Sequence, residues 1–117
     1  MISTERLRSL IAEELPRAIA CRRDLHMHPE IGYEERHTAD FIHRQLAETG
    51  VAYEGGLAGG TGTLAYFPGK DASTSIALRA DIDALPIEEE GTQPWKSTIP
   101  GRMHACGHDG HTAILLT

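Results

Sequence analysis

The stretch MHACGHDGHTAILLT, residues 103–117, joins a dense group of reactive side chains to the apolar beginning of a helix over about 111–116. Thiolate, imidazole and carboxylate groups are the usual protein ligands of divalent transition metals. Cys106 and His108 lie two positions apart, so that in extended backbone their side chains point to the same side. The stretch therefore predicts a metal-binding loop that leads into a helix. Its five ligand-type residues are His104, Cys106, His108, Asp109 and His111.

A polar surface loop is the simpler interpretation of the same residues, with Asp109 as the cap of the helix and the histidines solvated. We favour metal binding because five ligand-type side chains fall within eight positions and their chemistry suits a soft or borderline metal. A structural zinc finger does not fit, because the paired Cys-x-x-Cys and His-x-x-x-His spacings are missing.

Apolar residues recur at helical spacing in the N-terminal part of the chain. Ser3 and Thr4 suit a helix start, because their hydroxyl groups can accept hydrogen bonds from the free amides of the first turn. Pro16 predicts a kink or a restart. The pair His28-Pro29 predicts the end of this helical region, since the residue before a proline disfavours helical angles.

The middle of the chain predicts a second helix and then strands. The helix is expected over about 38–49, with Gly50 in the left-handed conformation that ends many helices. The glycine-rich residues 55–62 indicate a flexible connection, and residues 63–67 and 75–79 are predicted strands. Helices followed by strands and a further helix indicate an α/β arrangement in which helices cover a sheet.

Composition and charge exclude several classes of partner. The chain has 117 residues and a net charge of −6, without the basic block that would follow a nucleic-acid backbone or an anionic membrane. The first residues lack the apolar run of a signal peptide, and no stretch is apolar enough to span a membrane. A cytoplasmic location is therefore expected, in which Cys21 and Cys106 are more often reduced than joined in a disulfide.

Two further clusters carry ionisable residues. Asp81 and Asp83 follow the predicted strand and alternate to one face, where they can orient imidazoles or tune a metal-bound water; two solvated carboxylates explain the spacing equally well. His26 and His28 lie on different faces if they end a helix. For these histidines we favour a structural role, in capping or in packing against the loop that carries Cys106.

Three motifs occur together and in order: RRDLHMHPE at 22–30, LRADIDALPI at 78–87 and MHACGHDGHT at 103–112. They resemble the amidohydrolase branch of the M20 metallopeptidase family, which includes hippurate hydrolases, indole-acetyl-amino-acid hydrolases and N-acetyl-diaminopimelate deacetylases. The resemblance implies an α/β protein, the N-terminal part of an α/β/α sandwich catalytic domain, truncated before the lid and dimerisation domain. Residues 1–117 are then expected to form a partial catalytic domain.

The resemblance also implies roles for individual residues. Cys106 and His108 match metal ligands of a centre with two divalent ions, for which Mn, Zn, Co and Ni are candidates. Asp83 matches an aspartate associated with catalysis, whereas Asp81 stands where relatives often have a metal-binding histidine and receives no ligand role. The remaining ligands and the glutamate that acts as general base are expected beyond Thr117, so the 117 residues alone are expected to be inactive.

The reaction implied by the resemblance is hydrolysis of the amide bond of an N-acyl amino acid, such as a hippurate-like substrate, by metal-activated water. The full-length form is expected to be a cytoplasmic homodimer or homotetramer that acts on a small molecule. Two alternatives stay open. One is a non-catalytic metal-binding or interaction module, and the other is a cysteine hydrolase that uses Cys106 with a nearby histidine.

Overall fold

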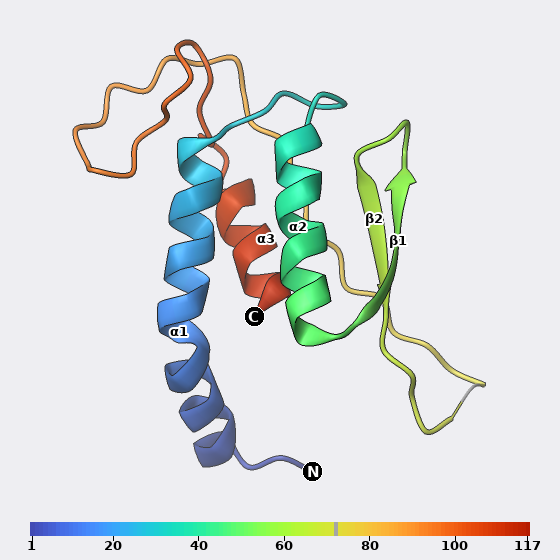
Figure 1. Cartoon of the computed structure of the whole chain (residues 1–117). Helices are drawn as coiled ribbons and strands as arrows, with labels where there is room; N and C mark the ends of the chain where they lie inside the picture. The colour runs from blue at the N-terminus through green and yellow to red at the C-terminus, as the bar shows by residue number, and fades with distance from the viewer. Residues whose placement is uncertain (72) are drawn as a thin grey trace.

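A computed structural model describes residues 1–71 and 73–117. The elements follow in the order α1 (Thr4–Met27), α2 (Arg36–Thr49), β1 (Ala52–Leu57), β2 (Gly62–Tyr66) and α3 (His108–Leu116). The helices α1 and α2 both contact α3, and the β1–β2 hairpin lies against α2 (Figure 1). Within this described part, no helix combines the length and the apolar character that crossing a membrane requires.

The ends of α1 agree with the local signals in the sequence. The hydroxyl of Ser3 accepts a hydrogen bond from the amide of Arg6 at 3.1 Å, which caps the first turn. The helix ends at Met27, with His28 as its C-terminal cap. The helix does not restart at Pro16, because a proline removes one amide donor while the following turns keep their own hydrogen bonds and their buried face.

The helix α2 begins two positions earlier than predicted and ends where predicted. Gly50 has φ 70° and ψ 15°, the left-handed conformation expected after Thr49. At the other end the carboxylate of Glu30 accepts from the amides of His37 at 3.0 Å and Thr38 at 2.7 Å. A residue outside the helix therefore satisfies its free amides and fixes the loop that follows α1.

The strands β1 and β2 pair antiparallel, with Ala52 opposite Tyr66 and an irregularity between Glu54 and Leu57. The predicted strand at 63–67 is confirmed with a shift of one residue. The glycine-rich segment, expected to be a flexible connection, instead contributes its first residues to β1. A side chain at Gly55 would have its Cβ 2.6 Å from the His43 ring, so the glycine allows β1 to approach α2.

The predicted strand at 75–79 is wrong: residues 75–79 form no strand and are not paired with any part of the described chain. Ile76 and Leu78 are 93% and 76% exposed. Strand propensity alone does not form a strand, because the backbone needs a hydrogen-bonded neighbour and the apolar face needs a cover. Two isolated backbone pairs follow instead, between Ile31 and Ala84 and between Leu85 and Met103.

The apolar core lies where the three helices meet. Cys21, Leu25, Phe41 and Ala113 form it, and Leu116 packs at its edge. Both cysteines are free thiols, as predicted. Burial raises the pKa of the Cys21 thiol, which suits a small core residue and not a reactive group.

The exposed apolar residues around 76–78 and at the end of α3 predict self-association of the 117-residue chain. Of these residues Leu78, Ile114 and Leu115 line a cleft of about 500 Å³, together with Arg79 and His111. Replacing Ile76 by Ser should weaken association by about tenfold or more, because a large apolar side chain is no longer buried between chains. Sedimentation over a range of concentrations measures this, with Ile2→Ser as the matched control. A wild-type chain that stays monomeric contradicts the prediction.

Candidate metal centre

The imidazole of His108 is held by Asp83. Its Nδ1 lies 2.9 Å from Asp83 Oδ1 and 3.0 Å from the Asp83 carbonyl oxygen. Both partners are acceptors, so Nδ1 must carry the hydrogen and donate it. The neutral ring then has its lone pair on Nε2, which is the state in which a histidine binds a metal.

The second carboxylate of this cluster lies on the other side of the same ring. Asp81 Oδ2 is 3.5 Å from His108 Nε2, and Asp81 Oδ1 pairs with Arg79 at 2.8 Å. The hydroxyl of Thr112 donates to the Asp81 carbonyl at 3.0 Å, which ties this segment to α3. The structure thus places both aspartates beside His108, in the arrangement that their alternate spacing predicts.

Cys106 is exposed and lies in the loop immediately before α3. Together with Nε2 of His108 it offers a thiol and an imidazole, a donor set that fits zinc and similar divalent ions. Within residues 1–71 and 73–117, no three His, Cys, Asp or Glu side chains are grouped closely enough to hold an ion. Among the described residues, Cys106 and His108 alone therefore do not make up a complete coordination shell.

The remaining histidines of the motif differ in environment. The His111 ring is exposed and its centroid lies 5.6 Å from that of His108. His104 is 5% exposed, and neither of its ring nitrogens has a hydrogen-bond partner among the described residues. Burial lowers the pKa of His104 and so favours its neutral ring, although the negative charge of Asp109 acts in the opposite direction.

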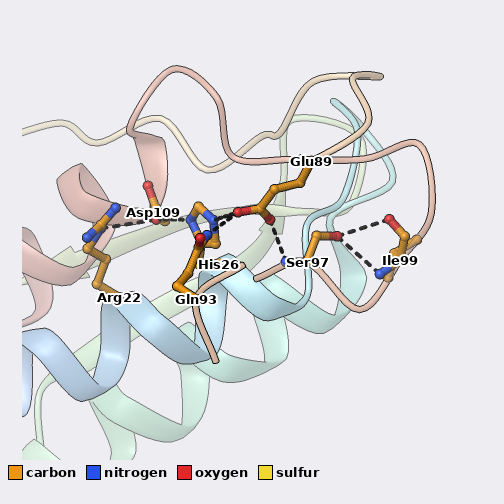
Figure 2. Close-up of polar contacts among 7 residues, drawn as sticks. All are labelled: Arg22, His26, Glu89, Gln93, Ser97, Ile99 and Asp109. Carbon is orange, nitrogen blue, oxygen red and sulfur yellow. Dashed lines mark hydrogen bonds and ion pairs between the residues drawn. The ribbon is translucent and has the colours of Figure 1, made fainter. Parts of the chain in front are cut away.

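Asp109 is not the solvated helix cap of the surface-loop interpretation. Gly107 occupies the cap position of α3, and Asp109 lies in the first turn with 0% exposure. Its Oδ2 is 2.7 Å from His26 Nδ1 and 3.2 Å from Arg22 Nε (Figure 2). The surface-loop interpretation fails because a buried charge is tolerated only when it is paired.

The other side of His26 faces a second buried carboxylate. His26 Nε2 is 3.1 Å from Glu89 Oε1, and Glu89 also accepts hydrogen bonds from the Ser97 amide and from Gln93 (Figure 2). Burial alone would raise the pKa of Glu89, but the hydrogen bonds from Ser97, His26 and Gln93 lower it below the usual range. Sequence reasoning missed Glu89, which carries no local signal.

The loop between Leu85 and Met103 is anchored on the end of α1. The guanidinium of Arg23 lies 3.8 Å from the centroid of the Trp95 ring, and the Thr98 amide donates to the Met27 carbonyl at 2.9 Å. His28 has a different partner, because its Nδ1 lies 2.7 Å from the carbonyl oxygen of Asp24 within α1. His26 thus contacts the start of α3 and the loop that carries Glu89, and His28 caps α1, which are structural roles of the kind expected.

Comparisons with known proteins agree with these motifs. A family model described as peptidase family M20/M25/M40 matches residues 77–117. An N-acyl-L-amino acid amidohydrolase of Geobacillus stearothermophilus is 44% identical over 115 residues, 98% of this chain and 31% of that protein. IAA-amino acid hydrolase ILR1-like 5 of Arabidopsis thaliana is 47% identical over 98 residues, 84% of this chain and 22% of that protein.

A solved structure is also similar over most of the chain. The YXEP protein of Bacillus subtilis, described as a dinuclear metal-binding peptidase from the M20 family, superposes with a TM-score of 0.82 at 44% identity. The similarity covers 86% of this chain and 28% of that one, so the chain spans between a fifth and a third of these relatives. Its mixed α/β structure matches M20 peptidases, and the chain belongs to peptidase family M20.

Proposed function

We propose that these residues carry part of the metal centre of an amidohydrolase that cleaves the amide bond of N-acyl amino acids, including hippurate-like substrates. The observation that supports it most is the hydrogen bond from His108 Nδ1 to Asp83, which leaves Nε2 as a metal donor two positions from the exposed Cys106. The relatives named for N-acyl-amino acid and IAA-amino acid hydrolysis support the substrate class.

In this proposal Cys106 and His108 are the ligands that the chain contributes. Zn, Mn, Co and Ni are the candidate ions, of which Mn prefers oxygen donors and is the poorest match to a thiolate. Two ions per complete site are proposed because the similar YXEP protein is described as dinuclear. Cys106 and His108 would help to hold a divalent ion, which would supply Lewis-acid activation of the scissile carbonyl and of water. Cys106 is a ligand here and not a nucleophile.

Asp83 acts through His108 in this proposal. Its carboxylate fixes the tautomer and the orientation of the ring, and its negative charge makes the imidazole a stronger ligand. Asp81 adds a second negative charge near Nε2, which favours a cation there. The general base is a glutamate of the complete catalytic domain and is not among the residues assigned in this chain.

The whole enzyme is proposed to act on a small molecule in the cytoplasm as a homodimer or homotetramer. The net charge of −6 and the lack of a basic block favour neither nucleic acid nor an anionic membrane as a partner.

Replacing Cys106 by Ser or His108 by Ala in the full-length enzyme should remove activity through loss of metal. A serine hydroxyl stays protonated near neutral pH, so metal affinity should fall by at least about 100-fold, more than the loss of a residue that only supports a ligand. Metal content per chain and turnover of benzoyl-glycine are measured together, with Cys21→Ala as the control. A Cys106→Ser enzyme with full metal content and no activity identifies a nucleophile and contradicts the proposal.

Replacing Asp83 by Asn should lower metal affinity by about 10- to 100-fold, because the amide no longer fixes the ring through a charged acceptor. Asp81→Asn removes the same charge from the cluster but leaves the bond to Nδ1, so its effect should be smaller. Competition with a chromogenic chelator measures both affinities. Equal losses in the two variants would show that only charge matters and that Asp83 does not orient His108.

The 117-residue chain supplied with Zn²⁺ or Mn²⁺ should not hydrolyse benzoyl-glycine at a measurable rate. An incomplete metal shell and the absence of an assigned base each reduce the rate by orders of magnitude. Release of benzoate is followed by chromatography, beside the full-length enzyme as the positive control. Robust release that a chelator abolishes would show that the 117 residues form a complete site.

A further inference from the structure

The buried contacts of His26 lie behind the candidate metal loop and have no part in the proposed chemistry. We propose that His26 is a positioning residue of the metal site: it holds Asp109, and through it the first turn of α3 and the His108 ring, without touching the ion. This inference rests on the proposed function, because it assigns a role toward the same ligands. His26 lies 80 or more positions before Cys106 and His108 in the chain.

The charges of the network support this role. The side chains of Asp109 and Glu89 are 0% and 2% exposed, and the His26 side chain between them is 6% exposed. His26 and Arg22 both contact Asp109 Oδ2, and His26 also contacts Glu89, so each of the two buried carboxylates has a partner in the network.

His26 is the principal partner of Asp109. Arg22 also contacts Asp109, but its side chain is 50% exposed and solvent screens that pair. The contact to His26 is shorter, at 2.7 Å against 3.2 Å, and lies fully inside the protein. Charge-assisted hydrogen bonds of this length are the strong ones.

The start of α3 depends on this anchor because its own cap supplies no side chain. Gly107 has φ 91° at the cap position and makes no side-chain hydrogen bond to the first turn. Asp109, the next residue but one, joins this turn to α1, whereas His108 and Thr112 join α3 to the segment that carries Asp81 and Asp83. His108 lies between the two and is held by Asp83 on one side and by the anchored turn on the other.

The orientation of His26 is itself fixed by the loop that carries Glu89. The Ser97 amide and the Gln93 side chain both donate to the Glu89 carboxylate, so the acceptor for Nε2 is held in place. The ring therefore presents Nδ1 to Asp109 in one direction. A replacement of His26 that loses the contact to Asp109 or the contact to Glu89 should therefore loosen the loop before α3.

The test compares His26→Gln with His28→Gln in the full-length enzyme. Both change a histidine near the end of α1, but His28 contacts the Asp24 carbonyl and not the metal loop. Zn²⁺ affinity is measured by chelator competition, and the Co²⁺-loaded protein is examined for its thiolate-to-metal absorption. Urea unfolding of the metal-free proteins defines conditions in which every variant is folded.

We expect His26→Gln to weaken Zn²⁺ binding by about 10- to 100-fold and to alter the Co²⁺ spectrum, as for other residues that orient a ligand. The His28→Gln protein should stay within about twofold of wild type. Wild-type affinity and an unchanged spectrum for folded His26→Gln overturn the inference. So does an equal loss in both variants, which would indicate general destabilisation of the helix end.

A second pair of variants tests the same role if His26→Gln does not fold. Glu89→Gln weakens the outer contact of His26 and should reduce Zn²⁺ affinity by about tenfold. Its control is Glu88→Gln, because Glu88 is exposed and contacts the Gly101 amide instead. Equal affinities in this pair overturn the inference.

The outcome also separates the inference from the proposed function. If the wild-type enzyme binds no metal, or Cys106→Ser and His108→Ala bind it as well as wild type, both proposals fail. If those two variants lose metal while folded His26→Gln keeps it, only the role of His26 fails.

Discussion

The complete burial of the Asp109 carboxylate is the constraint on which the arrangement of this chain depends. A charge without solvent contact must be paired, and its partners must come from elements that pack against α3. Arg22 and His26 meet this need because they lie four positions apart, on one face of α1. The residues directly before them, Cys21 and Leu25, form the apolar core with Ala113, so the polar and the apolar contacts of α1 with α3 support each other.

The two aspartates that border the candidate metal loop have opposite environments. Asp83 is half-exposed and faces the ring of His108, where a cation would add to the favourable contacts of its charge. Asp109 is buried and has its charge balanced by the protein itself. The Asp83 carboxylate can thus take part in the chemistry of the site, whereas the Asp109 carboxylate holds the surrounding structure in place.

Local signals in the sequence predicted the features that depend on neighbouring residues. Ser3, Gly50 and the His28-Pro29 pair gave the helix ends to within two positions, because caps act within a single turn. The motif residues gave the family, which the comparisons confirm. Contacts between distant residues could not be predicted in this way. The Glu30 cap of α2, the burial of Asp109 and the contacts of Glu89 all depend on packing. The strand expected at 75–79 is missing because no other described segment pairs with it, which strand propensity does not predict.

The separation of His26 and Asp109 by 83 positions has a consequence during synthesis of the protein. At a ribosomal rate of about 5–20 residues per second, His26 is made on the order of ten seconds before the carboxylate that it will contact. During that interval α1 can form, since its hydrogen bonds are local, but its polar face has no partner and its apolar face no cover. The nascent helix is then a natural target for chaperones, and the site takes shape only when α3 emerges. Order in the metal loop therefore cannot precede the synthesis of α3.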